Sequence, residues 1–258
     1  SRKLLGQAGS SRRAIATAKL ARKVVTVSEF SAREIESLYG IARSHVVVIH
    51  NGVSDEFFPA CTEPVKAELY RRWAIPEAGF ILFVGGADPR KNHTRFLQAV
   101  AKVRSQLGGR VVLLVGDPEH PQGSYRETAQ ELALEEDVRC TGRLDREDLR
   151  RLYSCTDLFV FPSRYEGFGM PVLEAMACGA PTITSSTSSL PEVAGDAALL
   201  VDPDDVDGLS LAMVRALADS DLRAILRQRG FERVRQFTWR QAAMQTSALY
   251  RELCRSLS

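Results

Sequence analysis

The feature that most constrains the fold is a regular alternation of short apolar runs with helical segments after residue 79. Segments that read as strands lie at 80–84, 110–115, 138–141, 158–161, 182–185 and 198–201, and several of them are largely apolar. Segments with helical spacing of apolar residues lie at 94–107, 125–134, 147–154, 171–178, 190–194 and 206–218. Uniformly apolar runs indicate strands buried on both faces, joined by right-handed helical crossovers. The sequence therefore predicts an α/β fold with a Rossmann-like parallel sheet and helices on both faces.

Two shorter strands precede this region, at 24–27 and 46–49, and Ser28 is placed to cap a helix between them. Residues 55–59 are typical of a linker. Helices expected at 221–236 and 239–256 end the chain, and the last is predicted to return toward the N-terminal part. We therefore divide the chain at 1–59, 60–236 and 237–258.

Composition narrows the class of protein but identifies no partner. With 45% hydrophobic and 26% charged residues, the chain is typical of a soluble globular protein. The net charge of +2 gives no reason to expect a nucleic-acid partner. No apolar run approaches the roughly 20 residues of a membrane span. The odd number and irregular spacing of the five cysteines indicate reduced thiols of a cytoplasmic protein, not a disulfide framework (Cys61, Cys140, Cys155, Cys178 and Cys254).

The first 23 residues are basic. They contain seven lysines and arginines and no acid, the first acid being Glu29. One interpretation is a helix with a solvated basic face. The other is a peripheral contact with an anionic membrane surface, which would place the protein at the inner face of the membrane.

A glycine-rich loop joins the strand at 158–161 to the next helix. Pro162 ends the strand, Pro171 suits the first turn of the helix, and Gly179 is placed to stop it. A helix start leaves backbone N–H groups without partners and favours an anion. The loop residues expected to face a ligand in this way are Gly167, Phe168, Gly169 and Met170.

Two carboxylates flank this loop, Glu166 before it and Glu174 one turn into the helix. Carboxylates accept hydrogen bonds from sugar and ribose hydroxyls, so the pair favours a nucleotide-sugar site over a simple anion site. The alternative is a buried strand–turn–helix crossover that carries two surface glutamates.

The stretch E-G-F-G-M-P-V-L-E from Glu166 to Glu174 resembles the signature of the retaining GT-B glycosyltransferases of the "glycosyl transferases group 1" family. The resemblance implies a GT-B type fold, with Glu166 beside the transferred sugar and Glu174 on the ribose hydroxyls. The segments around Ser28 and Asn51 are also similar to the end of the family's N-terminal domain. That domain is much longer, so we expect either a fragment or a partner chain that supplies the missing half.

Cations follow the strand at 80–84, in the segment G-G-A-D-P-R-K-N-H. A diphosphate needs cations when no metal site is evident. The segment is similar to the family's pyrophosphate clamp, in which Lys91 matches best and Arg90 lies beside it. Gly85 and Gly86 allow close approach, but many members carry arginine where this chain has Gly86. Arg143 is the candidate replacement. The alternative for Arg90 and Lys91 is a solvated turn.

Two polar loops allow competing interpretations. The hydroxyl-rich segment 185–192 resembles a family segment, and it either faces the substrates or forms a polar loop before a capped helix. The D-x-D string at 202–204 could bind a metal–diphosphate in another glycosyltransferase fold. Because it lies between a strand and a helix without further ligands, we interpret it as a turn and a cap.

The resemblance implies transfer of a hexose from a nucleotide-diphosphate sugar to a glycan or lipid-linked acceptor, with retention of configuration and without a metal or other cofactor. The segment at 85–93 resembles mannosyltransferase-like members, so GDP-mannose is the first candidate donor and UDP-glucose the second. One alternative is a sugar-phosphate synthase, and another is a non-catalytic nucleotide-sugar-binding domain that needs a partner chain. Glu166, Lys91 and Arg90 are the predicted catalytic residues.

Overall fold

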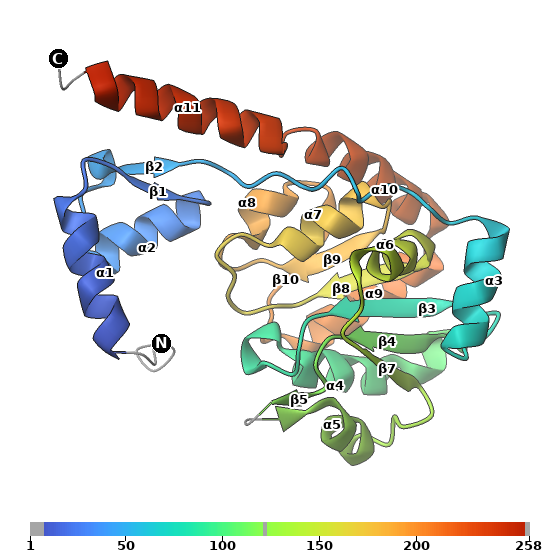
Figure 1. Ribbon diagram of the computed structural model, residues 1–258. Coiled ribbons are helices and arrows are strands. Elements are labelled where there is room, and N and C mark those ends of the chain that lie inside the picture. Colours follow the sequence, from blue (N-terminus) through green and yellow to red (C-terminus); the bar gives the residue numbers. More distant parts are fainter. Residues whose placement is uncertain (1–7, 121–122, 256–258) are drawn as a thin grey trace.

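The main structural unit is a six-stranded parallel sheet in the order β10-β9-β8-β3-β4-β7 (Figure 1). The structure is a computed structural model that describes residues 8–120 and 123–255. The sheet strands are β3 (Phe80–Val84), β4 (Val111–Val115), β7 (Val138–Gly142), β8 (Leu158–Phe161), β9 (Thr182–Ser185) and β10 (Ala198–Val201). The predicted parallel sheet is therefore confirmed.

Helices cover both faces of this sheet, which is why β3, β4 and β8 are apolar throughout. Phe80 and Leu82 of β3 point to one core, whereas Ile81 and Phe83 point to the other. The first core is closed by α3 (Glu63–Arg72), α6 (Arg146–Cys155), α7 (Met170–Ala177) and α8 (Leu190–Ala194). The second is closed by α4 (His93–Val103), α5 (Tyr125–Glu131) and α9 (Val206–Ala218), and α10 (Ser220–Val234) packs along α7 and α9.

The N-terminal part is smaller. It consists of α1 (Ala8–Leu20), β1 (Val24–Thr26), α2 (Glu29–Tyr39) and β2 (Val46–Val48), with β1 and β2 paired in parallel. Helix α11 (Trp239–Arg255) extends back toward β1 and β2 (Figure 1), and Arg22 Nη1 donates to the Leu253 carbonyl at 3.0 Å. The last helix thus returns to the N-terminal part, while the proposed domain boundaries remain predictions.

Local differences from the expected elements are few. Helix α3 was not expected, because its sequence carries five charged residues and buries only Leu69. The antiparallel pairing of β5 (Glu119–His120) with β6 (Gly123–Ser124) was also not expected. Short 3-10 helices lie at Arg43–His45, Pro89–Lys91 and Arg104–Gln106. Within the described ranges, no helix is long and apolar enough to cross a membrane.

One prediction about the cysteines is wrong. Cys61 and Cys155 form a disulfide, with their Cα atoms 5.1 Å apart. The two residues lie 94 positions apart in the sequence, and only the path of the chain past the end of α6 brings them together. Spacing could not reveal this pairing. Cys140, Cys178 and Cys254 are free thiols, and burial raises the pKa of Cys178 to about 12.

Candidate active site

The glycine loop leads from β8 into α7 at the carboxyl edge of the sheet, the edge where open α/β sheets bind ligands. Gly169 directly precedes the helix with φ of +114°, and a Cβ atom there would lie 2.7 Å from Leu190 Cδ2. The position therefore requires glycine. Helix α7 begins at Met170 with Pro171 in its first turn, and Gly179 follows its end with φ of +81°. The helix was expected at 171–178, so the observed helix begins and ends one residue earlier.

Glu166 and Lys91 form the centre of the site. Lys91 Nζ lies 2.6 Å from Glu166 Oε1, and the Ser163 hydroxyl donates to the same oxygen at 2.7 Å. The side chain of Lys91 is only 21% exposed and that of Glu166 only 15%. Lys91 Nζ also lies 5.1 Å from the centroid of the Phe161 ring. The structure thus brings together an ammonium and a carboxylate that the sequence separates by 75 positions.

Arg90 is oriented differently from its neighbour. Its Nη2 atom lies 2.6 Å from Asp88 Oδ2, and Nε contacts the same carboxylate. This hydrogen-bonded pair raises the pKa of Arg90 and fixes the guanidinium within its own turn. Of the two predicted cations, Lys91 is the one placed against Glu166.

The glycines after β3 shape the neighbouring loop. The Gly85 carbonyl accepts a hydrogen bond from the Tyr125 hydroxyl, and a Cβ atom on Gly85 would lie 3.1 Å from Lys91 Cγ. Gly86 faces Asp117, whose carboxylate lies 3.6 Å from Arg143 Nη2. Arg143 is 82% exposed. The predicted replacement cation therefore lies beside the Gly86 loop, with its side chain largely in solvent.

The remaining loop residues divide between core and ligand-facing roles. Phe168 is buried, and its ring lies 5.9 Å from the His50 ring and 5.8 Å from the Phe237 ring. Its side chain therefore belongs to the core, and only its backbone N–H is left for a ligand. Met170 is partly buried against the same core as the first residue of α7.

Glu174 is an acid of the site whose pKa is raised by burial. The Tyr153 hydroxyl contacts Glu174 Oε2 at 3.4 Å, and burial raises the pKa of the carboxyl above 4.5. The native state thus binds this proton more tightly than the unfolded chain. Between the two pKa values, stability falls as pH rises, because ionisation is harder in the folded protein.

We therefore expect Glu174→Gln to increase stability at pH 7.5 and to flatten the fall in stability from pH 4.5 upward. The amide removes the cost of burying a charge. Urea unfolding at both pH values measures this effect, and Glu147→Gln, which alters an exposed side chain of α6, is the control. A variant as pH-dependent as the parent would contradict this role of Glu174.

The hydroxyl-rich segment supports the glycine loop. The Ser189 hydroxyl donates to the Glu166 and Phe168 carbonyls at 2.9 and 2.8 Å, and Ser188 Oγ accepts from the Glu166 N–H at 3.2 Å. These serines hold the loop that carries Glu166. Of the two interpretations of this segment, the structure favours a polar loop before a short helix.

A contact that the sequence did not reveal joins α8 to the N-terminal part. Glu192 Oε1 accepts from the Glu29 N–H at 2.8 Å, and Oε2 accepts from the Phe30 N–H at 3.2 Å. His50 Nε2 lies 2.8 Å from Oε1. The Ser28 hydroxyl donates to the Gly167 carbonyl at 2.7 Å. The start of α2 is thus bonded to the glycine loop and to the helix behind it.

The D-x-D string is a turn and a cap, as predicted. Asp202 Oδ1 accepts from the Asp204 N–H at 2.8 Å, and Asp205 Oδ1 caps α9 through the Gly208 N–H at 2.9 Å. Asp204 pairs with Arg164 at 2.9 Å. In the part of the chain that the structure describes, no group of three or more His, Cys, Asp or Glu side chains could hold a metal ion.

Residues 65–233 match the family "Glycosyl transferases group 1", and residues 3–57 match "Glycosyltransferase Family 4". Because the first match covers more than half of the chain, the protein belongs to the glycosyl transferases group 1 family. The glycine loop, Glu166, Lys91 and the sheet edge all lie inside that match.

Individual relatives agree with this membership. The chain is 34% identical to an O-antigen chain mannosyltransferase B of Escherichia coli, over 90% of this chain and 61% of that protein. It superposes on a sucrose-phosphate synthase from Thermosynechococcus elongatus with a TM-score of 0.81, at 28% identity over 99% of this chain and 65% of the other. The structure of an Anabaena protein, HepE, solved with UDP-glucose, shares the fold with a TM-score of 0.83 and 21% identity, over 96% of this chain and 70% of HepE. The chain thus spans about three fifths of the length of its mannosyltransferase relative.

Proposed function

We propose that this protein transfers a hexose from a nucleotide-diphosphate sugar to a glycan or lipid-linked acceptor, with retention of configuration. The observation that carries the proposal is the Lys91–Glu166 pair beside the start of α7, at the carboxyl edge of the sheet. GDP-mannose is the first candidate donor because of the similarity to mannosyltransferases, and UDP-glucose is the second. We infer that no metal or other cofactor is needed.

In the proposed reaction, the bond between the anomeric carbon and the diphosphate breaks, the acceptor hydroxyl oxygen forms the new bond, and the hydroxyl proton passes to the leaving diphosphate. Lys91 and the N–H groups at the start of α7 stabilise the negative charge that develops on the leaving diphosphate. Glu166 accepts hydrogen bonds from hydroxyls of the transferred sugar, and Glu174 accepts them from the ribose. Arg143 is the second candidate contact for the diphosphate, whereas Arg90 acts through its turn.

Calorimetric titration with GDP, UDP, GDP-mannose and UDP-glucose tests the donor site and identifies the base. We expect micromolar binding of one nucleotide and about tenfold weaker binding by Glu174→Ala, because the ribose loses a charged acceptor. Binding of none of the four would refute the donor site. Binding without transfer in a protein that includes both halves would favour the non-catalytic alternative.

Gly86→Arg is expected to tighten binding of the preferred nucleoside diphosphate about three- to tenfold. A Cβ atom at Gly86 meets Asp117 at an ordinary 3.5 Å, so a side chain fits and can bring a guanidinium to the diphosphate. Part of the gain is offset by immobilising that side chain. The matched variant is Gly85→Arg, which would displace Lys91 and weaken binding. Equal affinities of these two variants would contradict the arrangement.

A further inference from the structure

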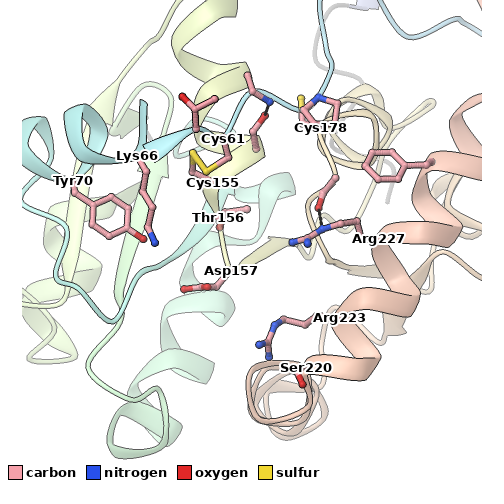
Figure 2. Close-up of a pocket in the computed structure, with 16 residues that line it drawn as sticks. Cys61, Lys66, Tyr70, Cys155, Thr156, Asp157, Cys178, Ser220, Arg223 and Arg227 are labelled. Atoms are coloured by element: carbon pink, nitrogen blue, oxygen red, sulfur yellow. Dashed lines mark hydrogen bonds between the residues drawn. A yellow bond between two sulfur atoms is a disulfide. The ribbon is translucent and has the colours of Figure 1, made fainter. Parts of the chain in front are cut away.

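A pocket of about 600 Å³ opens at the amino edge of the main sheet, opposite the glycine loop (Figure 2). Asp157, directly before β8, lies on its wall, whereas the glycine loop follows the other end of that strand. The remaining walls come from segment 59–62, from α3, from the end of α6, from the residues directly after α7 and from α10. The pocket is therefore separated from the proposed donor site by the length of β8.

The pocket is positively charged. Lys66 of α3 and Arg223 and Arg227 of α10 extend their charged ends into the same space (Figure 2). The one acid among the lining residues is Asp157, which already pairs with Arg110 at 3.0 Å. Across the described residues, no carboxylate lies within 4.0 Å of the three cations.

The two arginines are held in place without being neutralised. Arg223 Nη1 donates to the Ala216 and Leu217 carbonyls, both at 2.7 Å. Arg227 Nε donates to the Gly179 carbonyl at 2.8 Å. A guanidinium has five N–H donors, so these contacts with neutral carbonyls orient each arginine and leave donors for a ligand. Lys66 Nζ lies 5.3 Å from the centroid of the Tyr70 ring. Two oriented arginines and this lysine, without a counter-charge, favour binding of an anion.

We propose that this pocket binds a small phosphorylated metabolite through its phosphate group. A phosphate monoester carries a charge of about −1.5 to −2 at neutral pH, which matches a site of two arginines and one lysine. The pocket volume lies within the range of small-molecule sites, roughly 300–1,000 Å³. The rings of Tyr70 and Phe231 on its walls offer contact area for the organic part of the molecule.

Lysine acylation, quantified by peptide mass spectrometry, tests the site directly. We expect glycerol 3-phosphate to slow acylation of Lys66 several-fold, and glycerol alone to have no effect. Inorganic phosphate in a parallel titration shows whether the phosphate suffices without the organic part. Lys102, an exposed lysine of α4, is the internal control and should react unchanged. Unaltered reactivity of Lys66 at saturating concentrations of both phosphates would overturn the proposal.

Calorimetry on variants separates this pocket from the donor site. Lys66→Gln should weaken binding of glycerol 3-phosphate about tenfold, while Lys102→Gln should bind like the parent. Arg227→Gln should also weaken binding of glycerol 3-phosphate. Its matched control on α10 is Arg229→Gln, which should bind like the parent because Arg229 lies outside the pocket and pairs with Asp196. Thermal melts verify that each variant is folded. If binding instead depends on Lys91 and not on Lys66, the phosphate occupies the donor site and the proposal fails.

Discussion

Replacing Lys91 by methionine should weaken binding of the preferred nucleoside diphosphate by about 10- to 100-fold. A hydrogen bond to a charged group contributes about 1.5–3 kcal/mol, and each 1.4 kcal/mol corresponds to a factor of ten. Methionine keeps most of the side-chain length but supplies no charge. The change also leaves the Glu166 carboxylate, which is only 15% exposed, without its cation. The uncompensated carboxylate would then repel the diphosphate.

The neighbouring arginine provides a sharp comparison. Because Arg90 is bonded to Asp88, Arg90→Met should weaken nucleotide binding less than threefold, whereas a clamp of two equivalent cations would make the two variants alike. Lys102→Met controls for loss of one positive charge from the protein. Isothermal titration of all three variants measures the effect. Parent-like affinity of Lys91→Met would contradict the proposed site.

Replacing Glu192 by alanine should lower the free energy of unfolding by about 2–3 kcal/mol. Its carboxylate is 21% exposed and accepts from the Glu29 and Phe30 N–H groups at the start of α2. Hydrogen bonds to a charged group contribute about 1.5–3 kcal/mol, and an anion at a helix start adds a favourable dipole interaction. The contact with His50 is lost as well.

The matched control is Glu29→Ala, on the first turn of the same helix. Glu29 is 48% exposed and pairs with Arg43, so its loss should cost about 0–1 kcal/mol. Urea unfolding measures stability, and hydrogen exchange of the peptide covering 28–36 reports on the start of α2. We expect protection there to fall in Glu192→Ala alone. Equal effects of the two variants would mean that Glu192 does not hold α2.

Much of the architecture was readable because it depends on local patterns. The apolar run at Phe80–Val84 can bury the side chains of both its faces only between two layers of helices. The two hydrophobic cores, one on each face of the sheet, confirm this prediction. The limits of α7 followed from glycine and proline chemistry to within one residue, and Asp145 caps α6 locally through the Asp148 N–H. Each of these features is decided within a few residues of backbone.

The tertiary structure alone decided which distant groups meet. Strand order, the Cys61–Cys155 disulfide and the bonds from Glu192 to α2 join segments far apart in the sequence. Arg90 and Lys91 are neighbouring cations in the sequence, yet one side chain bonds its own turn and the other crosses to Glu166. Local propensity sets where elements begin and end, whereas the partners of a side chain depend on how the packed elements lie in space.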